Sequence, residues 1–373
     1  DDPAWSRFQR EWTRAAEEAC DAHAHTEVRA CLRQQRRDAA ILLDAAHAEG
    51  GAAPVAALDP TSCLETHGSA NPAIADARSR IARATVARLE GRMDDARALA
   101  DEALALAQAT ADPRVIAAAL HGSGLIGAQQ GRFDTAAEQF ESAHWMALRV
   151  DEPGVAADSA IELIDLLTNG SHFDEARRWS QNAVAALQRM SETDPMRWTQ
   201  FELVMSLMHQ RLHAFPEAVA AARRARQHVD QLDPAPRWLR ISAEMRLGGA
   251  LQVAGDADGA LDHLERALAW QLELRGEQHP ATARILHSLG ILHTSNLHQP
   301  EQGVELLERA LAVLDRPDSA PTLADAQAYE ALAVALIGLE RYARARDPVQ
   351  RTVDAYATLY PPEHPQLLTT YTL

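Results

Sequence analysis

Gly131-Arg-Phe-Asp-Thr-Ala136, with Ala143 seven residues on, contains the most informative pattern in this sequence. The same pattern recurs along the chain: a turn residue, an aromatic residue or methionine, an acidic residue, and small residues spaced seven apart. Its first small residue, called the anchor below, is found at Ala96, Ala136, Ala176, Ala218, Ala260, Gly303 and Ala345. These anchors are 40 to 43 residues apart, and a near-constant interval over seven matches indicates a repeat protein.

Each repeat is predicted to be a pair of antiparallel helices. A turn carrying Gly, Asn or Asp ends the first helix, and the anchor lies early in the second. Small residues about twelve positions before the anchor let the two helices pack closely: Ala84, Gly124, Ser206, Gly248, Gly290 and Ala333. The residue that starts the second helix is expected to fill the gap between the helices: Met93, Phe133, Phe173, Phe215 and Tyr342.

The composition excludes several kinds of protein. All 36 basic residues are arginine, so no Schiff-base lysine, Gly-Lys-Ser/Thr phosphate loop or kinase ATP-binding lysine is present in this sequence. A net charge of −17 argues against nucleic acid as a partner. No apolar run approaches the roughly 20 residues of a membrane helix, so we expect no membrane insertion by these residues.

The repeats resemble the tetratricopeptide repeat (TPR) family over roughly residues 70–373. Their period exceeds the family's usual length of about 34 residues. The segment 272–280, Leu-Glu-Leu-Arg-Gly-Glu-Gln-His-Pro, followed by Leu286-His-Ser-Leu-Gly290, is similar to the long repeats of kinesin light chains. The resemblance implies an all-α, right-handed solenoid of about seven helix pairs. Tyr360-Pro-Pro-Glu-His-Pro365 would open a truncated eighth repeat, whose first helix would cap the stack. We therefore expect a solenoid domain over residues 69–373.

Residues 1–68 do not follow the repeat and are predicted to form a small helical segment. Trp12, Ala19-Cys20, the stretch 28–37 (Val-Arg-Ala-Cys-Leu-Arg-Gln-Gln-Arg-Arg) and Cys63 resemble a segment of bacterial, especially myxobacterial, serine/threonine protein kinases. In those kinases the segment follows the transmembrane helix and precedes TPR repeats. The resemblance implies an extracytoplasmic location for this chain and a parent kinase whose catalytic domain lies outside it.

The three cysteines all fall within the first 63 residues. Cys20 and Cys31 flank the predicted turn at residues 21–25 almost symmetrically, so a helical hairpin would bring them face to face. A Cys20–Cys31 disulfide would suit an oxidising compartment. Pairing of either residue with Cys63, or three buried thiols, remain alternatives. Zinc bound by Cys20, His23, His25 and Cys31 is a weaker alternative, because the spacing is not a standard one.

No catalytic motif appears in the sequence. Gly-x-Ser-x-Gly, His-Glu-x-x-His and paired-carboxylate patterns are absent, and His287 and His293 are spaced poorly for a metal pair. His279 is explained by the His-Pro start of a repeat. We therefore expect a non-catalytic chain without cofactors.

The TPR resemblance implies a concave groove lined by the first helices. Arg211, Arg246 and Arg284 fall in consecutive repeats and would suit a carboxylate or phosphate on a peptide. The alternative is that these side chains are merely solvated. Carried over by repeat position, the groove candidates are His121, Leu125, Gln129, Asp165, Asn169, Gln200, Leu207, Arg211, Arg246, Gln252, Arg284, His287, Thr294, Gln327 and Glu330.

These observations predict a non-catalytic scaffold that binds a protein or peptide in its groove. We expect it to be the sensory or docking region of a bacterial transmembrane serine/threonine kinase. The alternative is a cytoplasmic TPR regulator or peptide receptor that controls a partner protein. A homodimer is compatible with either.

Overall fold

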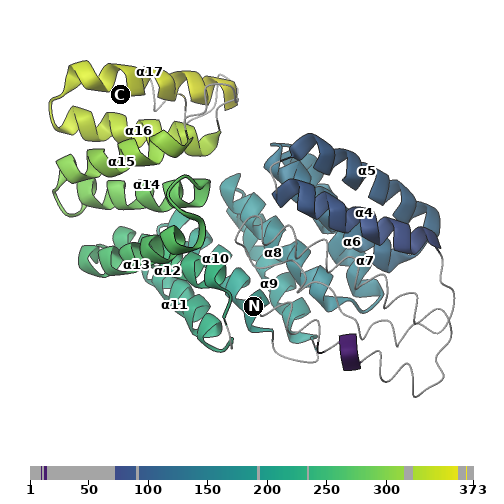
Figure 1. The fold of residues 1–373 in the computed structure, drawn as a ribbon. Helices are drawn as coiled ribbons and strands as arrows, with labels where there is room; N and C mark the ends of the chain where they lie inside the picture. Colours follow the sequence, from purple (N-terminus) through teal and green to yellow (C-terminus); the bar gives the residue numbers. More distant parts are fainter. Residues whose placement is uncertain are drawn as a thin grey trace. The chain divides into compact units, whose positions relative to one another are not determined.

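The computed structural model describes residues 10, 12–14, 72–89, 92–190, 194–232, 235–314, 322–359 and 367. Apart from short turns, these residues are helical, which confirms the all-α prediction (Figure 1). The predicted N-terminal segment 1–68, with its three cysteines, lies almost entirely outside the described residues.

The repeats divide into two compact units, which we describe separately. Unit 1 comprises residues up to 213 and 227–236, and unit 2 comprises 214–226 and 237 onward. Unit 1 holds α4 (Pro72–Leu89), α5 (Met93–Thr110), α6 (Pro113–Gln129), α7 (Phe133–Arg149), α8 (Pro153–Asn169), α9 (Phe173–Gln188) and α10 (Pro195–Arg211). The boundary falls within α11 (Phe215–Asp230). Unit 2 continues with α12 (Arg237–Val253), α13 (Ala257–Arg275), α14 (Pro280–Ser295), α15 (Pro300–Leu314), α16 (Leu323–Gly338) and α17 (Tyr342–Leu359).

The predicted small residues form the contact between the two helices of a pair. Every anchor is buried, and so is every small residue predicted twelve or thirteen positions before an anchor. An added Cβ on Gly248 would lie 2.7 Å from Leu264 Cγ, and one on Gly290 would lie 2.6 Å from Leu307 Cγ. A large side chain on the second helix therefore occupies the space that each glycine leaves, which follows from close packing of protein interiors.

The third repeat differs from this pattern. Ile164, fully buried on α8, occupies the position where other first helices carry a small residue. At the corresponding position of α9, where other repeats carry Phe140, Leu264 or Leu307, this repeat has Ser180. The large residue is therefore on the first helix and the small one on the second, the reverse of the other repeats. The combined side-chain volume is roughly the same, as expected where the space between helices is fixed.

The turns between first and second helices share one left-handed residue, five positions before each anchor. Its φ angle is positive in all six of these turns that the structure describes. Only two of the six residues are glycine, but the turns at Ser171, His298 and Glu340 carry the predicted Gly or Asn at a neighbouring position, Gly170, Asn296 and Gly338. The prediction of Gly, Asn or Asp in this turn was wrong only at His213. The six are Gly131, Ser171, His213, Gly255, His298 and Glu340.

The residues that begin the second helices do not all fill gaps. Met93 and Phe173 are partly buried against the core, as predicted. Phe133 is 57% exposed and Tyr342 is 65% exposed, so the prediction fails for these two. Their positions at the helix start, one residue after the turn, leave most of the ring in solvent.

Capping side chains explain where several first helices start. Asp112 accepts a hydrogen bond from the backbone N–H of Arg114, and Asp194 does the same for Met196. His279 Nδ1 accepts one from Ala281 N at 3.0 Å, directly before Pro280 opens α14. The His-Pro start predicted from the sequence is therefore confirmed as a cap followed by proline at the first helical position.

In each unit the first helices lie side by side, and the second helices cover one side of this row. α4, α6, α8 and α10 contact one another in order in unit 1, as do α12, α14 and α16 in unit 2. The second helices of neighbouring pairs make few contacts with each other. A stack with this asymmetry curves toward its first helices. We call the uncovered side of the first helices the inner face of the unit.

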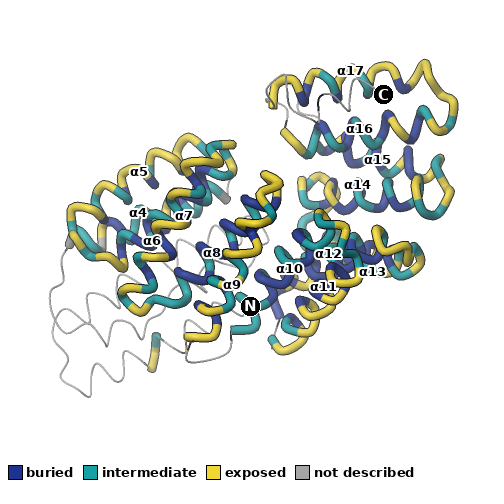
Figure 2. Tube along the Cα trace, turned by 180° about the vertical axis from the view of Figure 1, so that it is seen from behind, coloured by how far each residue is buried: buried dark blue, intermediate teal, exposed yellow. Residues whose placement is uncertain are grey.

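Figure 2 shows exposed and buried positions alternating along α5 and α17, as expected of surface helices with one apolar stripe. Beyond α17, Leu367 is helical and buried with Ala326, Ala355 and Tyr356. This contact agrees with a capping helix after the seventh pair, although the rest of residues 360–373 lie outside the described part. Within the described ranges, no helix is long and apolar enough to cross a membrane.

Candidate functional site

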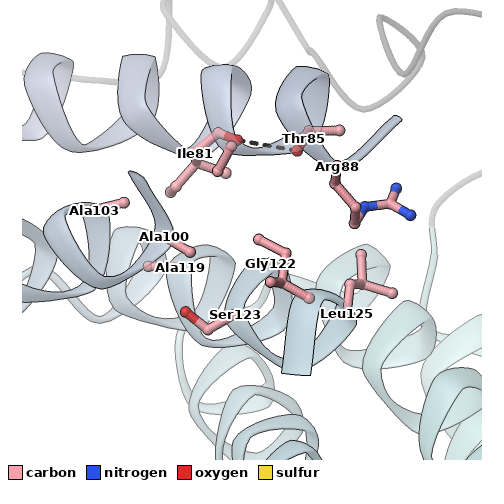
Figure 3. Close-up of a pocket in the computed structure, with 11 residues that line it drawn as sticks. Ile81, Thr85, Arg88, Ala100, Ala103, Ala119, Gly122, Ser123 and Leu125 are labelled. Carbon is pink, nitrogen blue, oxygen red and sulfur yellow. Dashed lines mark hydrogen bonds between the residues drawn. The ribbon is translucent and has the colours of Figure 1, made fainter. Parts of the chain in front are cut away.

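A small, mainly apolar pocket lies in unit 1 between α4, α5 and α6 (Figure 3). Its lining surrounds about 260 Å³ of empty space, but this figure includes open solvent outside the mouth, so the enclosed part is far smaller. The pocket is a shallow recess with enclosed room for about one water molecule, and it does not enclose an organic ligand. Its lining comprises Ile81, Ala84, Thr85, Arg88, Ala100, Ala103, Ala119, Gly122, Ser123, Leu125 and Ile126.

The pocket exists because both members of the interhelical pair are small in this repeat. Ala84 on α4 corresponds to Gly124, Gly248 and Gly290 of other repeats, where a large residue fills the space. The large residue is replaced here by Ala100 on α5. With alanine on both sides, the volume that Phe140 or Leu264 occupies elsewhere is left open.

One buried hydroxyl group faces this space without a partner. Ser123 lines the pocket and is only 5% exposed, and its Oγ has no hydrogen-bond partner. Figure 3 places its side chain between α4 and α6, opposite Ile81 and Thr85. Buried hydroxyl groups are normally satisfied, so this one is available to a polar atom that enters the pocket.

Charged side chains from neighbouring helices gather beside the pocket. Arg197 on α10 holds both carboxylate oxygens of Asp158 on α8, at 2.7 and 3.0 Å, and also donates to Asp194 at 2.6 Å. Its guanidinium lies over Gly154, where an added Cβ would be 3.3 Å from it. Burial disfavours the charge of Arg197, but the two carboxylates more than offset this and raise its pKa above the ordinary value.

The next inward carboxyl group on α8 is Glu162, one turn after Asp158. Burial on the inner face raises its pKa to about 7, and the charges of Asp165 and Asp158 act in the same direction. Arg88 of α4, which also lines the pocket, opposes them. Glu162 therefore keeps its proton to a higher pH than an ordinary glutamate.

His121 connects the pocket helix α6 to α8. Its Nδ1 lies 3.1 Å from Ser159 Oγ, and its ring packs against Phe140. Burial lowers the pKa of His121, and Arg88 and Arg197 add to this effect while Asp158 opposes it. The imidazole therefore stays neutral at physiological pH and acts as a hydrogen-bonding spacer.

Several predicted groove residues of unit 1 lie around this cluster. His121 and Asp165 belong to it directly, and Leu125 lines the pocket. Asn169 donates to Asp165 at 3.2 Å. Gln129 and Arg211 are exposed and Gln200 is partly buried, on the same row of first helices.

In unit 2 the predicted residues belong to α12, α14 and α16. Arg284 is exposed and Arg246 is partly buried. Gln252 and Asn296 exchange hydrogen bonds between α12 and the end of α14.

Other predicted residues of unit 2 are used in contacts inside the repeats. Thr294 donates to the carbonyl of Gly290 and fills the space left by Gly303, so its hydroxyl serves packing. Glu330 accepts from Tyr356 at 2.7 Å. His287 is held by the backbone of Gln327, and burial lowers its pKa.

The sequence analysis missed Arg88, Ser123, Asp158, Glu162 and Arg197. Asp158 and Arg197 are 39 residues apart, so their pairing follows only from adjacent repeats in register. The available signal was Asp194-Pro195, which fixes the start of α10 and hence the turn on which Arg197 lies.

Unit 2 contains a buried ionic cluster that is structural. Glu244 on α12 is 6% exposed and contacts His263 at 2.5 Å, Arg266 at 3.0 Å and Arg226 at 3.4 Å. These partners come from the second helices α11 and α13, so the cluster joins the two layers and does not face the inner side. Across the ranges that the structure describes, no group of three or more His, Cys, Asp or Glu side chains could hold a metal ion. Cys20, His23, His25 and Cys31 lie outside those ranges.

Comparison with known proteins agrees with this architecture. Residues 239–316 and 326–366 match two family models, both described as tetratricopeptide repeat. The chain carries tetratricopeptide repeats. No curated protein sequence matches it.

Solved structures show similar TPR folds. A Rap protein complexed with Competence and Sporulation Factor has a TM-score of 0.58 at 13% identity, over 93% of this chain and 96% of that one. A signal transduction ATPase with a TPR sensor from Pyrococcus horikoshii has a TM-score of 0.52 at 13% identity, over 75% of this chain and 42% of that one. Kinesin-light-chain repeats from Podosopora anserina are 20% identical over 54% of this chain and 94% of theirs, with a TM-score of 0.41. At these identities the likeness shows the TPR solenoid fold and nothing more.

Proposed function

We propose that this chain is a non-catalytic scaffold that binds an extended segment of a partner protein on the inner face of unit 1. The observation that carries the proposal is the pocket between α4, α5 and α6, with the unpartnered Ser123 hydroxyl in its wall. A side chain of the bound segment would lie over the mouth of the pocket, and the polar cluster on α6, α8 and α10 would contact the residues that follow it.

The similar fold of the Rap protein supports the proposal, because that protein is described in complex with a factor. The repeats of the Pyrococcus horikoshii signal transduction ATPase are described as a sensor. Both descriptions lead us to test this chain for binding of a peptide.

The test is a selection of short random peptides displayed on phage against the full chain. The affinity of the selected peptides is then measured for the wild type and for the variant Gly122→Trp, in which an indole ring is placed beside the pocket. An added Cβ on Gly122 meets only Ile81 Cγ2, at 3.8 Å, so the backbone accepts a side chain there. Ser142→Trp, at an exposed site on α7, is the matched control.

We expect the selected peptides to bind the wild type and Ser142→Trp equally and to lose at least about tenfold in affinity on Gly122→Trp. Equal binding by all three proteins would overturn the proposal for this face. The double variant Arg246→Ala, Arg284→Ala tests unit 2 in the same way, since those arginines were predicted to capture a carboxylate or phosphate.

We further propose that the scaffold is the sensory or docking region of a transmembrane serine/threonine kinase, on the extracytoplasmic side. Only the sequence resemblance of residues 12–63 supports this. A membrane span and a kinase domain encoded upstream of Asp1 are the expected result, and a different upstream domain would contradict it. Free thiols at Cys20 and Cys31 in the native protein would favour the cytoplasmic regulator instead. A homodimer, as a means of signal transmission, would appear as a doubled mass in solution.

A further inference from the structure

Two tryptophan rings lie side by side on the second helices α7 and α9 of unit 1. The ring centroids of Trp145 and Trp179 are 5.8 Å apart, and the ring planes are inclined at 51°. Trp145 is 45% exposed, and Trp179 is partly buried against the core of unit 1. Because both rings belong to second helices, the pair is part of a surface separate from the inner face.

A buried imidazole lies against both rings. His144 is fully buried, and its ring centroid is 4.8 Å from that of Trp145 and 5.0 Å from that of Trp179. Its Nδ1 lies 2.8 Å from the carbonyl oxygen of Ala156 on α8, and a carbonyl group only accepts, so Nδ1 carries the proton. Burial lowers the pKa of His144, which keeps the ring neutral. Nε2 is therefore an acceptor, and among the described residues it has no donor.

A carboxylate stands at the edge of the tryptophan pair. Glu141, exposed and one helical turn before Trp145, accepts a hydrogen bond from the indole Nε1 of Trp145 at 3.4 Å. Its charge also reaches His144, whose pKa it acts to raise. Arg178, next to Trp179 in sequence, pairs with Glu175 at 3.8 Å, and no described arginine stacks on either indole. A carboxylate, two indole faces and a buried acceptor nitrogen are thus gathered in one place, and each of them attracts a cation that carries N–H groups.

We propose that this surface binds an arginine side chain of a partner protein. The flat guanidinium would stack on the indole rings, and its N–H groups would donate to the carboxylate of Glu141 and to Nε2 of His144. Trp145 would swing outward to admit it, which its exposed position allows. A quaternary ammonium could contact the indoles but has no N–H group for the two acceptors. A lysine ammonium is compact and strongly hydrated, and it has no flat face to lie against a ring.

The experiment labels the full chain with fluorotryptophan and follows the fluorine NMR signals while N-acetyl-arginine methylamide is added. The signals of the pair are assigned from the variants Trp145→Phe and Trp179→Phe. We expect both signals to shift to saturation and the signals of the other tryptophans to stay in place. The matching citrulline compound, which keeps the shape without the charge, should bind at least about fivefold more weakly.

Two glutamate variants separate this site from the general acidity of the chain. Glu141→Gln should weaken binding of the arginine compound at least about threefold. Glu138→Gln, an exposed control on α7 that loses the same charge, should leave the affinity unchanged. Equal losses in the two variants, or equal shifts with the arginine and citrulline compounds, would overturn the inference.

The kind of cation is tested by the same titration. The lysine compound and tetramethylammonium should both bind more weakly than the arginine compound, and equal or tighter binding of either would overturn the assignment to arginine. The function proposed for the inner face stands or falls separately, because Glu141, His144, Trp145 and Trp179 take no part in it.

Discussion

A Cβ added to Gly124 would lie 2.6 Å from Cε1 of Phe140, on the facing helix of the same repeat. Phe140 is 1% exposed, so its ring has no free space into which it could move. The second repeat can therefore hold only glycine at this point of α6, as long as phenylalanine occupies the corresponding point of α7.

Gly124→Ala should destabilise the protein by about 1–2 kcal/mol. Overpacking typically costs about 1–3 kcal/mol, and the better helix propensity of alanine returns up to about 1 kcal/mol. Gly122→Ala, two residues away in the same helix, is the control, because its Cβ meets only Ile81 at 3.8 Å. Urea unfolding should show a lower midpoint for the first variant and an unchanged or higher midpoint for the second. Equal midpoints would mean that α6 and α7 are not locked together at Gly124.

Much of this fold could be predicted because it repeats. The anchors and the small residues before them mark helix contacts that recur every 40 to 43 residues, and each of them is buried. Repetition does not predict which of two facing positions carries the large side chain. In the third repeat Ile164 faces Ser180, so the large residue is on the first helix. In the first repeat Ala84 faces Ala100, so both residues are small, and the pocket lies beside them.

The site was less predictable for a related reason. His121, Leu125 and Asp165 could be assigned from repeat position, because the helical register puts those positions on the inner face. The raised pKa of Glu162 depends on its burial and on the charges of Arg88, Asp158 and Asp165. Arg88 belongs to another repeat, so the sequence around Glu162 does not predict this environment. Thr294 illustrates the opposite case, since a residue at a groove position is used to pack against Gly303.

Ser171→Gly and Glu340→Gly should each stabilise the protein. Both residues adopt left-handed backbone angles, with φ of 63° and 59°, that cost an ordinary residue about 1 kcal/mol more than glycine. Glycine loses part of this gain through the entropy of the unfolded chain, so we expect about 0.5 kcal/mol each. Thermal unfolding measures the effect, and Gly131→Ala, at the equivalent turn with φ of 76°, should shift the midpoint downward. A lower midpoint for the two glycine variants would show that their native side chains stabilise these turns.

Glu244→Ala should be among the most destabilising single substitutions in unit 2. Removing the carboxylate leaves His263 without its partner in a mostly buried site and leaves Arg266 with Asp262 alone, and loss of one member of such a cluster costs about 3 kcal/mol. Glu273→Ala is the matched control, because Glu273 pairs with Arg237 where both side chains are more than 60% exposed. Chemical unfolding should separate the two variants clearly, and similar losses would mean that the Glu244 cluster is energetically equivalent to a surface pair.

The stability of unit 1 should depend on Glu162 between about pH 4.5 and 7. The pKa of this carboxyl group is raised from 4.5 to about 7 in the folded chain, so the folded state holds the proton over a range in which the unfolded state has lost it. Stability therefore falls as pH rises through this window, because the folded state binds more protons than the unfolded state. Above pH 7 the full penalty is present, at most about 3 kcal/mol. Glu162→Gln removes it, so the variant should match the wild type at pH 4.5 and exceed it at pH 8 in urea unfolding. Glu138→Gln should follow the wild type at both pH values, and a constant difference between wild type and Glu162→Gln across the range would show that Glu162 does not titrate there.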